Sequence, residues 1–119
     1  MMAGDTPTSA GAPSPSVWAV GQLVTAIARS LAQRFNPVRE RGEVSGFMRA
    51  SSGHCYFTLK DGAGQVRCAM FKRAASMLVQ LPKDGDTVEV MGKLDVYPAR
   101  GDLQLIVESM RTGGQGALF

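Results

Sequence analysis

The feature that most constrains the fold of this chain is a pair of short segments, 54–60 and 65–71, in which side-chain character alternates. Period two is the pattern of a half-buried β-strand. The intervening residues 61–64, Asp-Gly-Ala-Gly, include two glycines able to adopt positive φ. We therefore expect an antiparallel hairpin with one buried face. The apolar side chains that fall on that face are Cys55, Phe57 and Leu59 in the first segment and Val66, Cys68 and Met70 in the second.

The outward side of this hairpin combines aromatic and basic side chains, namely those of Tyr56, Lys60, Arg67 and Phe71. Cys55 and Cys68 lie at inward positions, where small buried hydrophobes are expected. The absence of secretory features argues against a disulfide. The single histidine, His54, adjoins Cys55 on a strand. Their side chains therefore point to opposite faces, which does not suit a zinc site.

The rest of the chain predicts three more strands and two helical elements. Apolar residues at helical spacing indicate a helix over 22–35, which Asn36-Pro37 ends. We expect this helix to cover one end or flank of a barrel. Glycines inside the first strand indicate a bend of the kind that closes small barrels. The expected elements are strands at 38–48, 87–97 and 103–110 and a short helix or turn at 72–79. Five strands with a helix between the third and fourth define an all-β, five-stranded OB-fold Greek-key barrel.

Positive charge is concentrated in the middle of the chain. The net charge is +3, but residues 29–73 hold nine basic and three acidic residues, and the remainder is net negative. Such a concentration is expected of a phosphate-binding surface, although an ordinary solvated surface would show it too. No run approaches the ~18 apolar residues that a membrane span requires. We expect a cytoplasmic protein with no membrane partner.

Catalytic signatures are missing from the sequence. Four aspartates in the second half lie in or beside turns and form no recognisable metal cluster; they are Asp84, Asp86, Asp95 and Asp102. There is no phosphate loop, nucleophile elbow or Ser-His-Asp set. The sequence therefore predicts neither a cofactor nor a catalytic residue, and it favours binding over catalysis.

Three stretches together resemble a known family: GEVSGFMRASSGHCYFTLKD, QVRCAMF and GDTVEVMGKLDVYPARGDLQLIVESM. They resemble the N-terminal OB domain of the exodeoxyribonuclease VII large subunit, and the resemblance runs from about residue 17 onward. Gly21 differs from the family pattern, because the family more often has a capping serine where this helix begins. Residues 1–16 are rich in Pro, Gly, Ser, Ala and Thr and show no apolar periodicity, so we expect them to be disordered. The resemblance implies an OB domain at 17–111 and the start of a linker at 112–119. A catalytic domain would follow that linker, so no hydrolysis is expected of this chain.

The resemblance also implies a partner, single-stranded DNA, which the OB domain would present to the nuclease domain of the longer subunit. Small subunits of that enzyme are not expected to bind through this domain. OB grooves combine stacking of bases on aromatic rings with contacts to phosphates. We expect Tyr56 and Phe71 to stack, and Arg49, Lys60 and Arg67 to meet phosphates. His54 lies at a loop edge and would stack or hydrogen-bond there. Tyr97 and Arg100 lie in the loop between the fourth and fifth strands and would clamp the DNA from the other side.

Most of these assignments have a simpler alternative. Tyr56 would also fit a cross-strand pair. Phe71 would also fit a position covered by the following helix, and Tyr97 would also fit as a residue that packs the loop. Basic side chains on a sheet also serve solubility, and Arg100 belongs first to a turn. Two other functions stay open. One is a protein-interaction OB module that docks a partner subunit, and the other is an RNA-binding OB domain.

Overall fold

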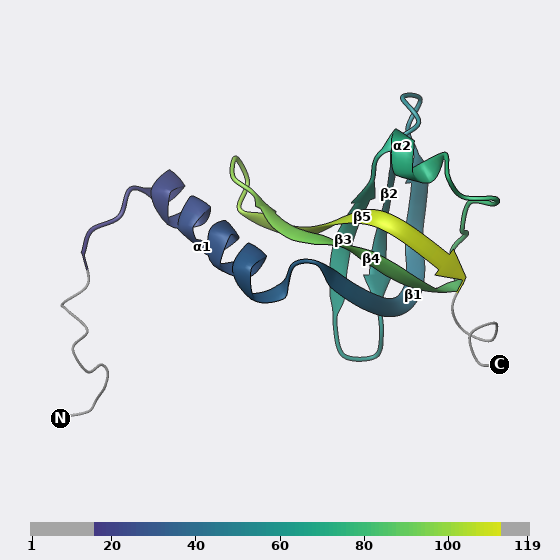
Figure 1. The fold of residues 1–119 in the computed structure, drawn as a ribbon, viewed down its shortest axis with the longest axis horizontal. Helices are drawn as coiled ribbons and strands as arrows, with labels where there is room; N and C mark the ends of the chain where they lie inside the picture. The colour runs from purple at the N-terminus through teal and green to yellow at the C-terminus, as the bar shows by residue number, and fades with distance from the viewer. Residues whose placement is uncertain (1–15, 113–119) are drawn as a thin grey trace.

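The computed structural model describes residues 16–112, which form a closed five-stranded barrel with one long and one short helix (Figure 1). Except for Ser16, the expected disordered segment lies outside the described residues, as does the linker beyond Thr112. The elements in chain order are α1 (Val20–Phe35), β1 (Val38–Arg49), β2 (Cys55–Lys60), β3 (Gln65–Met70), α2 (Lys72–Ala75), β4 (Thr87–Tyr97) and β5 (Asp102–Thr112). The predicted fold class is confirmed, with strand boundaries within two residues of expectation.

The barrel closes in the strand order β1-β2-β3-β5-β4. Neighbouring strands are antiparallel except β3 and β5, which are parallel. In that pair Arg67 lies opposite Gln104, and Ala69 lies opposite Ile106. Because β1 also pairs with β4, every strand has a neighbour on both sides. This is the Greek-key arrangement of an OB fold.

The barrel interior is filled by the inward residues that the alternation predicts. Phe57, Met70 and Leu105 are fully buried among shorter aliphatic side chains, and the ring of Phe47 stacks on that of Phe57 with centroids 6.0 Å apart. The two cysteines are both free and buried, as expected. Ala69 lies on the outward side of β3 by alternation but is also buried, since it lies between Tyr56 on β2 and Ile106 on β5.

Strand β1 bends sharply in its second half, where the sequence placed a glycine. Gly46 has a φ of 65°, and the β1–β2 register shifts between Ser45 and Met48. The loop before β4 covers this bend, because the backbone N–H of Phe47 donates to Asp84 Oδ1 at 2.8 Å. The bend lets one strand pair with β4 through its first half and with β2 through its second.

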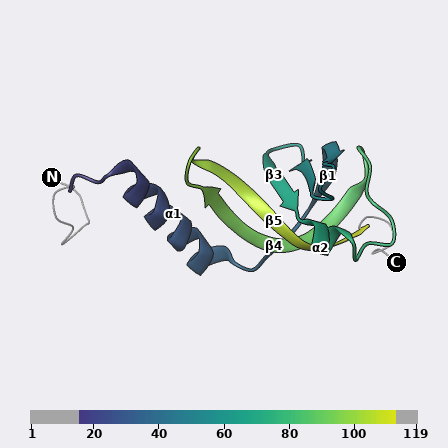
Figure 2. The same cartoon turned by 90° about the horizontal axis from the view of Figure 1, so that it is seen from above.

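Helix α1 does not cover the barrel as expected. None of its residues is buried, and Leu23 and Ile27 remain 41% and 46% exposed. Figures 1 and 2 both show it projecting from the barrel beside the far end of the β4–β5 hairpin, and its main contact is with β4. The Asn36 side chain fixes its C-terminal end, because the amide donates to the carbonyl of Leu94 at 2.9 Å and accepts from its N–H at 2.7 Å. The helix therefore follows the hairpin instead of the barrel.

The start of α1 has no side-chain cap. The helix begins at Val20 with Ala19 as the N-cap residue, and no side chain bonds the first turn. This agrees with the absence of a serine near Gly21. Neither of the helices that the structure describes is long and apolar enough to cross a membrane.

Candidate nucleic-acid interface

Three rows of side chains cross the outer face of β2 and β3. Strand pairing places Tyr56 beside Ala69, Thr58 beside Arg67, and Lys60 beside Gln65. Because alternate residues of a strand share a face, the buried positions of Cys55, Phe57 and Leu59 turn Tyr56, Thr58 and Lys60 outward. The structure thus brings the aromatic and basic residues that the sequence predicted onto one surface.

Arg67 is held across the sheet by its neighbour on β2. Its Nη1 donates to Thr58 Oγ1 at 2.8 Å in an exposed hydrogen bond. A guanidinium has five N–H donors, so this bond orients the group and leaves donors for a phosphate. Within residues 16–112, Arg67, Lys60 and Arg49 form no ion pair with an acidic side chain. Their charge is therefore not neutralised by direct pairing.

His54 and Phe71 form a second part of the surface, where the β1–β2 loop meets the start of α2. The backbone N–H of Lys72 donates to His54 Nδ1 at 2.8 Å. The His54 and Phe71 rings meet edge to face, with centroids 5.3 Å apart and planes at 70°. Phe71 is the N-cap residue of α2 and remains 47% exposed, so the short helix does not cover it. The Phe71 side chain remains accessible to a base.

Arg49 ends β1 and pairs with Cys55 at the start of β2. Its exposed side chain therefore lies beside the loop that carries His54. Its charge also acts on the buried neighbour. Burial raises the pKa of the Cys55 thiol, and the guanidinium of Arg49 partly opposes that rise.

Tyr97 and Arg100 lie at the turn between β4 and β5, apart from the other six residues. The N–H groups of Arg100 and Gly101 both donate to the carbonyl of Tyr97, at 3.1 and 2.7 Å. Arg100 also pairs with Asp102, its Nε lying 3.2 Å from Oδ2. Figures 1 and 2 show this turn beside α1, away from α2. A strand that reaches Tyr97 must therefore cross β5.

Sequence reasoning missed several residues on the same face. Gln104 and Ile106 on β5 lie beside Arg67 and Ala69, and Lys93 on β4 lies opposite Ile106. On the other side, Met48 is exposed opposite Tyr56. Alternation within the strand 103–110 already indicated that Gln104 and Ile106 face outward. No local pattern in the sequence indicates that β5 lies next to β3; only the predicted barrel topology implies that pairing.

Acidic side chains near the surface gather at the hairpin turn. Asp61 Oδ1 accepts the N–H groups of Ala63 and Gly64 at 2.8 and 3.0 Å, and these bonds lower the pKa of Asp61. Glu43 lies opposite Lys60 in the β1–β2 register. Negative charge therefore borders Lys60 but not the row of Tyr56 and Ala69. A polyanion would accordingly lie along the Tyr56 row.

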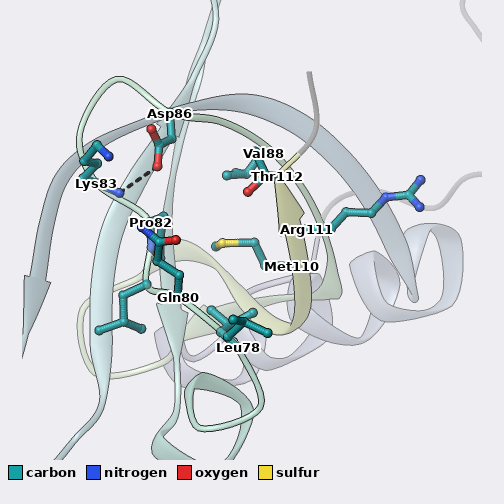
Figure 3. Close-up of a pocket in the computed structure, with 11 residues that line it drawn as sticks. Leu78, Gln80, Pro82, Lys83, Asp86, Val88, Met110, Arg111 and Thr112 are labelled. Carbon is teal, nitrogen blue, oxygen red and sulfur yellow. Dashed lines mark hydrogen bonds between the residues drawn. The ribbon is translucent and has the colours of Figure 1, made fainter. Parts of the chain in front are cut away.

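A hollow of about 490 Å³ lies elsewhere, between the α2–β4 loop and the end of β5 (Figure 3). Leu78, Pro82 and Met110 line it, and at its rim the Lys83 N–H donates to Asp86 Oδ2 at 3.0 Å. None of the eight predicted site residues lines this hollow. Among residues 16–112, no group of three or more His, Cys, Asp or Glu residues is arranged to hold a metal ion.

The fold and this exposed basic and aromatic face define the class of protein. The family described as OB-fold nucleic acid binding domain matches residues 18–111, and the chain belongs to that family.

Within this class the chain is similar to the N-terminal domain of one enzyme subunit. It is 60% identical over 108 residues to the exodeoxyribonuclease 7 large subunit of Delftia acidovorans, a match covering 91% of this chain and 24% of that protein. It is 45% identical over 103 residues to the same subunit of Bordetella avium, a match covering 87% of this chain and 23% of that protein. The chain thus spans about a quarter of the length of the curated relatives that it matches.

Solved structures share the fold at low sequence identity. A replication protein A heterotrimer bound to single-stranded DNA aligns with a TM-score of 0.54 and 16% identity, over 68% of this chain and 60% of that one. An asparaginyl-tRNA synthetase of Entamoeba histolytica aligns with a TM-score of 0.57 and 22% identity, over 65% of this chain and 20% of that one. These likenesses confirm the fold.

Proposed function

We propose that this chain binds single-stranded DNA across the outer face of β2 and β3. The observation that carries the proposal is the joint placement of Tyr56, Arg67 and Lys60 on one outward face, bordered by the exposed Phe71 ring. The similarity to exodeoxyribonuclease 7 large subunits supports DNA as the nucleic acid.

Binding would combine stacking with phosphate contacts. Each base stacked on Tyr56 or Phe71 would contribute about 1–3 kcal/mol, and one OB domain covers roughly 4–16 nucleotides. Arg67, already oriented by Thr58, would meet a phosphate with its remaining N–H donors. Arg49 and His54 would border the strand at the β1–β2 loop, and Tyr97 with Arg100 would hold it where it leaves β5.

The rest of the proposal concerns the longer protein. By analogy with the relatives, residues 17–111 would hold the strand, the segment from 112 would lead to a nuclease domain, and 1–16 would be a disordered lead. Small subunits would bind elsewhere on the large subunit, in the cytoplasm and without a membrane partner. The purified chain should then release no oligonucleotides, with or without magnesium.

The test is a fluorescence-anisotropy titration with a labelled single-stranded oligonucleotide at several salt concentrations. Arg67→Ala should weaken binding about equally for all sequences, because a phosphate contact carries no base information. Its salt slope should fall by about 0.7, the single-strand value for one lost contact. Arg29→Ala, on the projecting helix α1, removes the same charge outside this surface and should change neither.

Three outcomes would count against the proposal. Unchanged affinity in Lys60→Ala, Arg67→Ala and the double variant would place the site elsewhere. Tighter binding of an RNA oligonucleotide of the same sequence would favour an RNA-binding domain. No salt-dependent binding of either would favour a module that docks a protein.

A further inference from the structure

A second group of cationic side chains lies on the outer face of β1, β4 and β5. The strand registers arrange it in two rows that each cross three strands. One row is Arg41, Glu89 and Arg111, and the next is Arg39, Met91 and Ser109. Hydrogen-bond donors therefore occupy the four corners, three of them guanidinium groups. We call these six residues the arginine patch.

Glu89 holds two of the three guanidinium groups in place. Its Oε2 lies 2.6 Å from Arg41 Nη2, and its Oε1 accepts from Arg111 Nε and Nη2 at 3.1 and 2.8 Å. The Glu89 side chain is only 14% exposed, whereas those of Arg41 and Arg111 are 60% and 66% exposed. The carboxylate thus lies beneath the arginines, which keep further N–H groups for a ligand.

The charge of the patch is not balanced. Three arginines face one carboxylate, and Arg39 forms no ion pair within the described part of the chain. Along the same face, Glu108 is paired with Lys93 at 3.7 Å, while Glu43 on β1 lies opposite Lys60. The patch therefore carries a local excess of positive charge.

The surface between the rows is hollowed. A depression of about 300 Å³ is bordered by Arg39, Glu89, Ser109 and Arg111, with Met91 in its lining. An oxyanion in this depression would meet Arg39 and Arg111 from opposite sides and the Ser109 hydroxyl as a third donor. Arginine suits such an anion, because its planar group binds phosphate oxygens in pairs.

We propose that the arginine patch is a second phosphate-binding site, which takes the backbone of a nucleic-acid strand after it leaves the β2–β3 face. This inference rests on the function proposed above. Strand β5 connects the two surfaces, since Gln104 lies beside Arg67 while Ser109 and Arg111 lie further along it. At about 3.3 Å per residue, the seven steps from Gln104 to Arg111 span roughly 23 Å. Only a strand longer than the first site requires can reach both.

The test compares a short and a long single-stranded oligonucleotide, of about 6 and 30 nucleotides. The first lies near the lower end of the roughly 4–16 nucleotides that one OB domain covers, and the second exceeds that range. Arg39→Ala is the main variant, because Arg39 is exposed and outside the Glu89 network. It should weaken the long oligonucleotide about threefold to tenfold and lower its salt slope by about 0.7, one single-strand phosphate contact. The short oligonucleotide should bind as to the unaltered chain. Arg29→Ala is the matched control and should affect neither.

Arg111→Ala gives a second reading of the same site. Its melting temperature is measured first, since it breaks part of the Glu89 network, and binding is then compared well below that temperature. It should show the same dependence on oligonucleotide length as Arg39→Ala.

The outcomes separate this proposal from the one on which it rests. If Arg39→Ala and Arg111→Ala weaken the long oligonucleotide no more than Arg29→Ala does, the arginine patch only ties three strands together. If they weaken the short and long oligonucleotides equally, the first site includes this face and no second site exists. If the unaltered chain binds neither oligonucleotide, the proposed function itself fails.

Discussion

Replacing Gly92 with alanine should be the most damaging single-methyl change in the barrel. Gly92 lies in β4 at the shift in the β4–β5 register and is buried. A Cβ atom built there would lie 2.9 Å from the carbonyl carbon of Ile106 and 3.0 Å from Val107 Cα, both in the backbone of β5. A backbone cannot rotate aside as a side chain can, so β4 and β5 would have to separate.

The expected cost is at the upper end for an overpacked core, about 3 kcal/mol. A domain of this size has roughly 5–15 kcal/mol of stability in total. At about 4–8 °C per kcal/mol, the melting temperature should fall by roughly 12–24 °C. Differential scanning calorimetry of the purified chain measures this, and urea unfolding gives the free energy independently.

Two other glycines provide graded controls. Gly46→Ala adds a methyl group in open space but at a φ of 65°, and should cost about 1–2 kcal/mol for the left-handed conformation alone. Gly62→Ala meets nothing within 4 Å and should stay within about 0.5 kcal/mol of the parent. A Gly92→Ala protein that melts with the Gly62→Ala protein would show that β4 and β5 are not in this register.

Two further predictions concern titration. Hydrogen bonds from Arg41 and then Arg111 lower the pKa of Glu89 from its ordinary 4.5 to about 2, so its stabilising contribution is present above pH 4.5 and is lost as the pH falls through 2. Melting temperatures recorded from pH 6 to pH 2 should drop less steeply for Glu89→Gln, and parallel curves would refute the assignment. Burial raises the pKa of Cys68 to about 12 and also raises that of Cys55. Both thiols should therefore react far more slowly with a thiol reagent in the native chain than in urea. Rapid native labelling of Cys55 would mean that β2 faces the other way, with Tyr56 inside.

Most of the barrel could be predicted because its signals are local. Alternation fixes which side of β2 faces inward, and Gly46 marks the bend of β1 without knowledge of its partners. The position of α1 could not be predicted in this way. Its apolar residues fit a packed helix, but its direction depends on the Asn36 amide bonding to Leu94, 58 residues away. No local pattern reports such a contact.

The candidate interface divides along the same line. Tyr56, Lys60, Arg67 and Phe71 were predicted from one hairpin; the first three share its outer face, and Phe71 lies at the start of α2, at the other end of the hairpin from Lys60. Tyr97 and Arg100 were expected to close the groove from the opposite side, but the extended β4–β5 hairpin carries them away from α2. Gln104 was missed because parallel pairing between β3 and β5 depends on the whole topology. The Thr58 bond to Arg67 follows from the register, which the sequence did not specify.

The parallel contact between β3 and β5 also sets the order in which this chain can fold during synthesis. Arg67 and Gln104 are neighbours in space, yet 37 positions separate them along the chain. Until β5 leaves the ribosome, β3 and β4 each expose an unpaired edge, and such edges invite pairing with other chains. We expect nascent chains that stall before Asp102 to be prone to aggregation and protease-sensitive. Chains released after Thr112 should resist both, and pulse proteolysis of ribosome-bound chains of increasing length would show the transition.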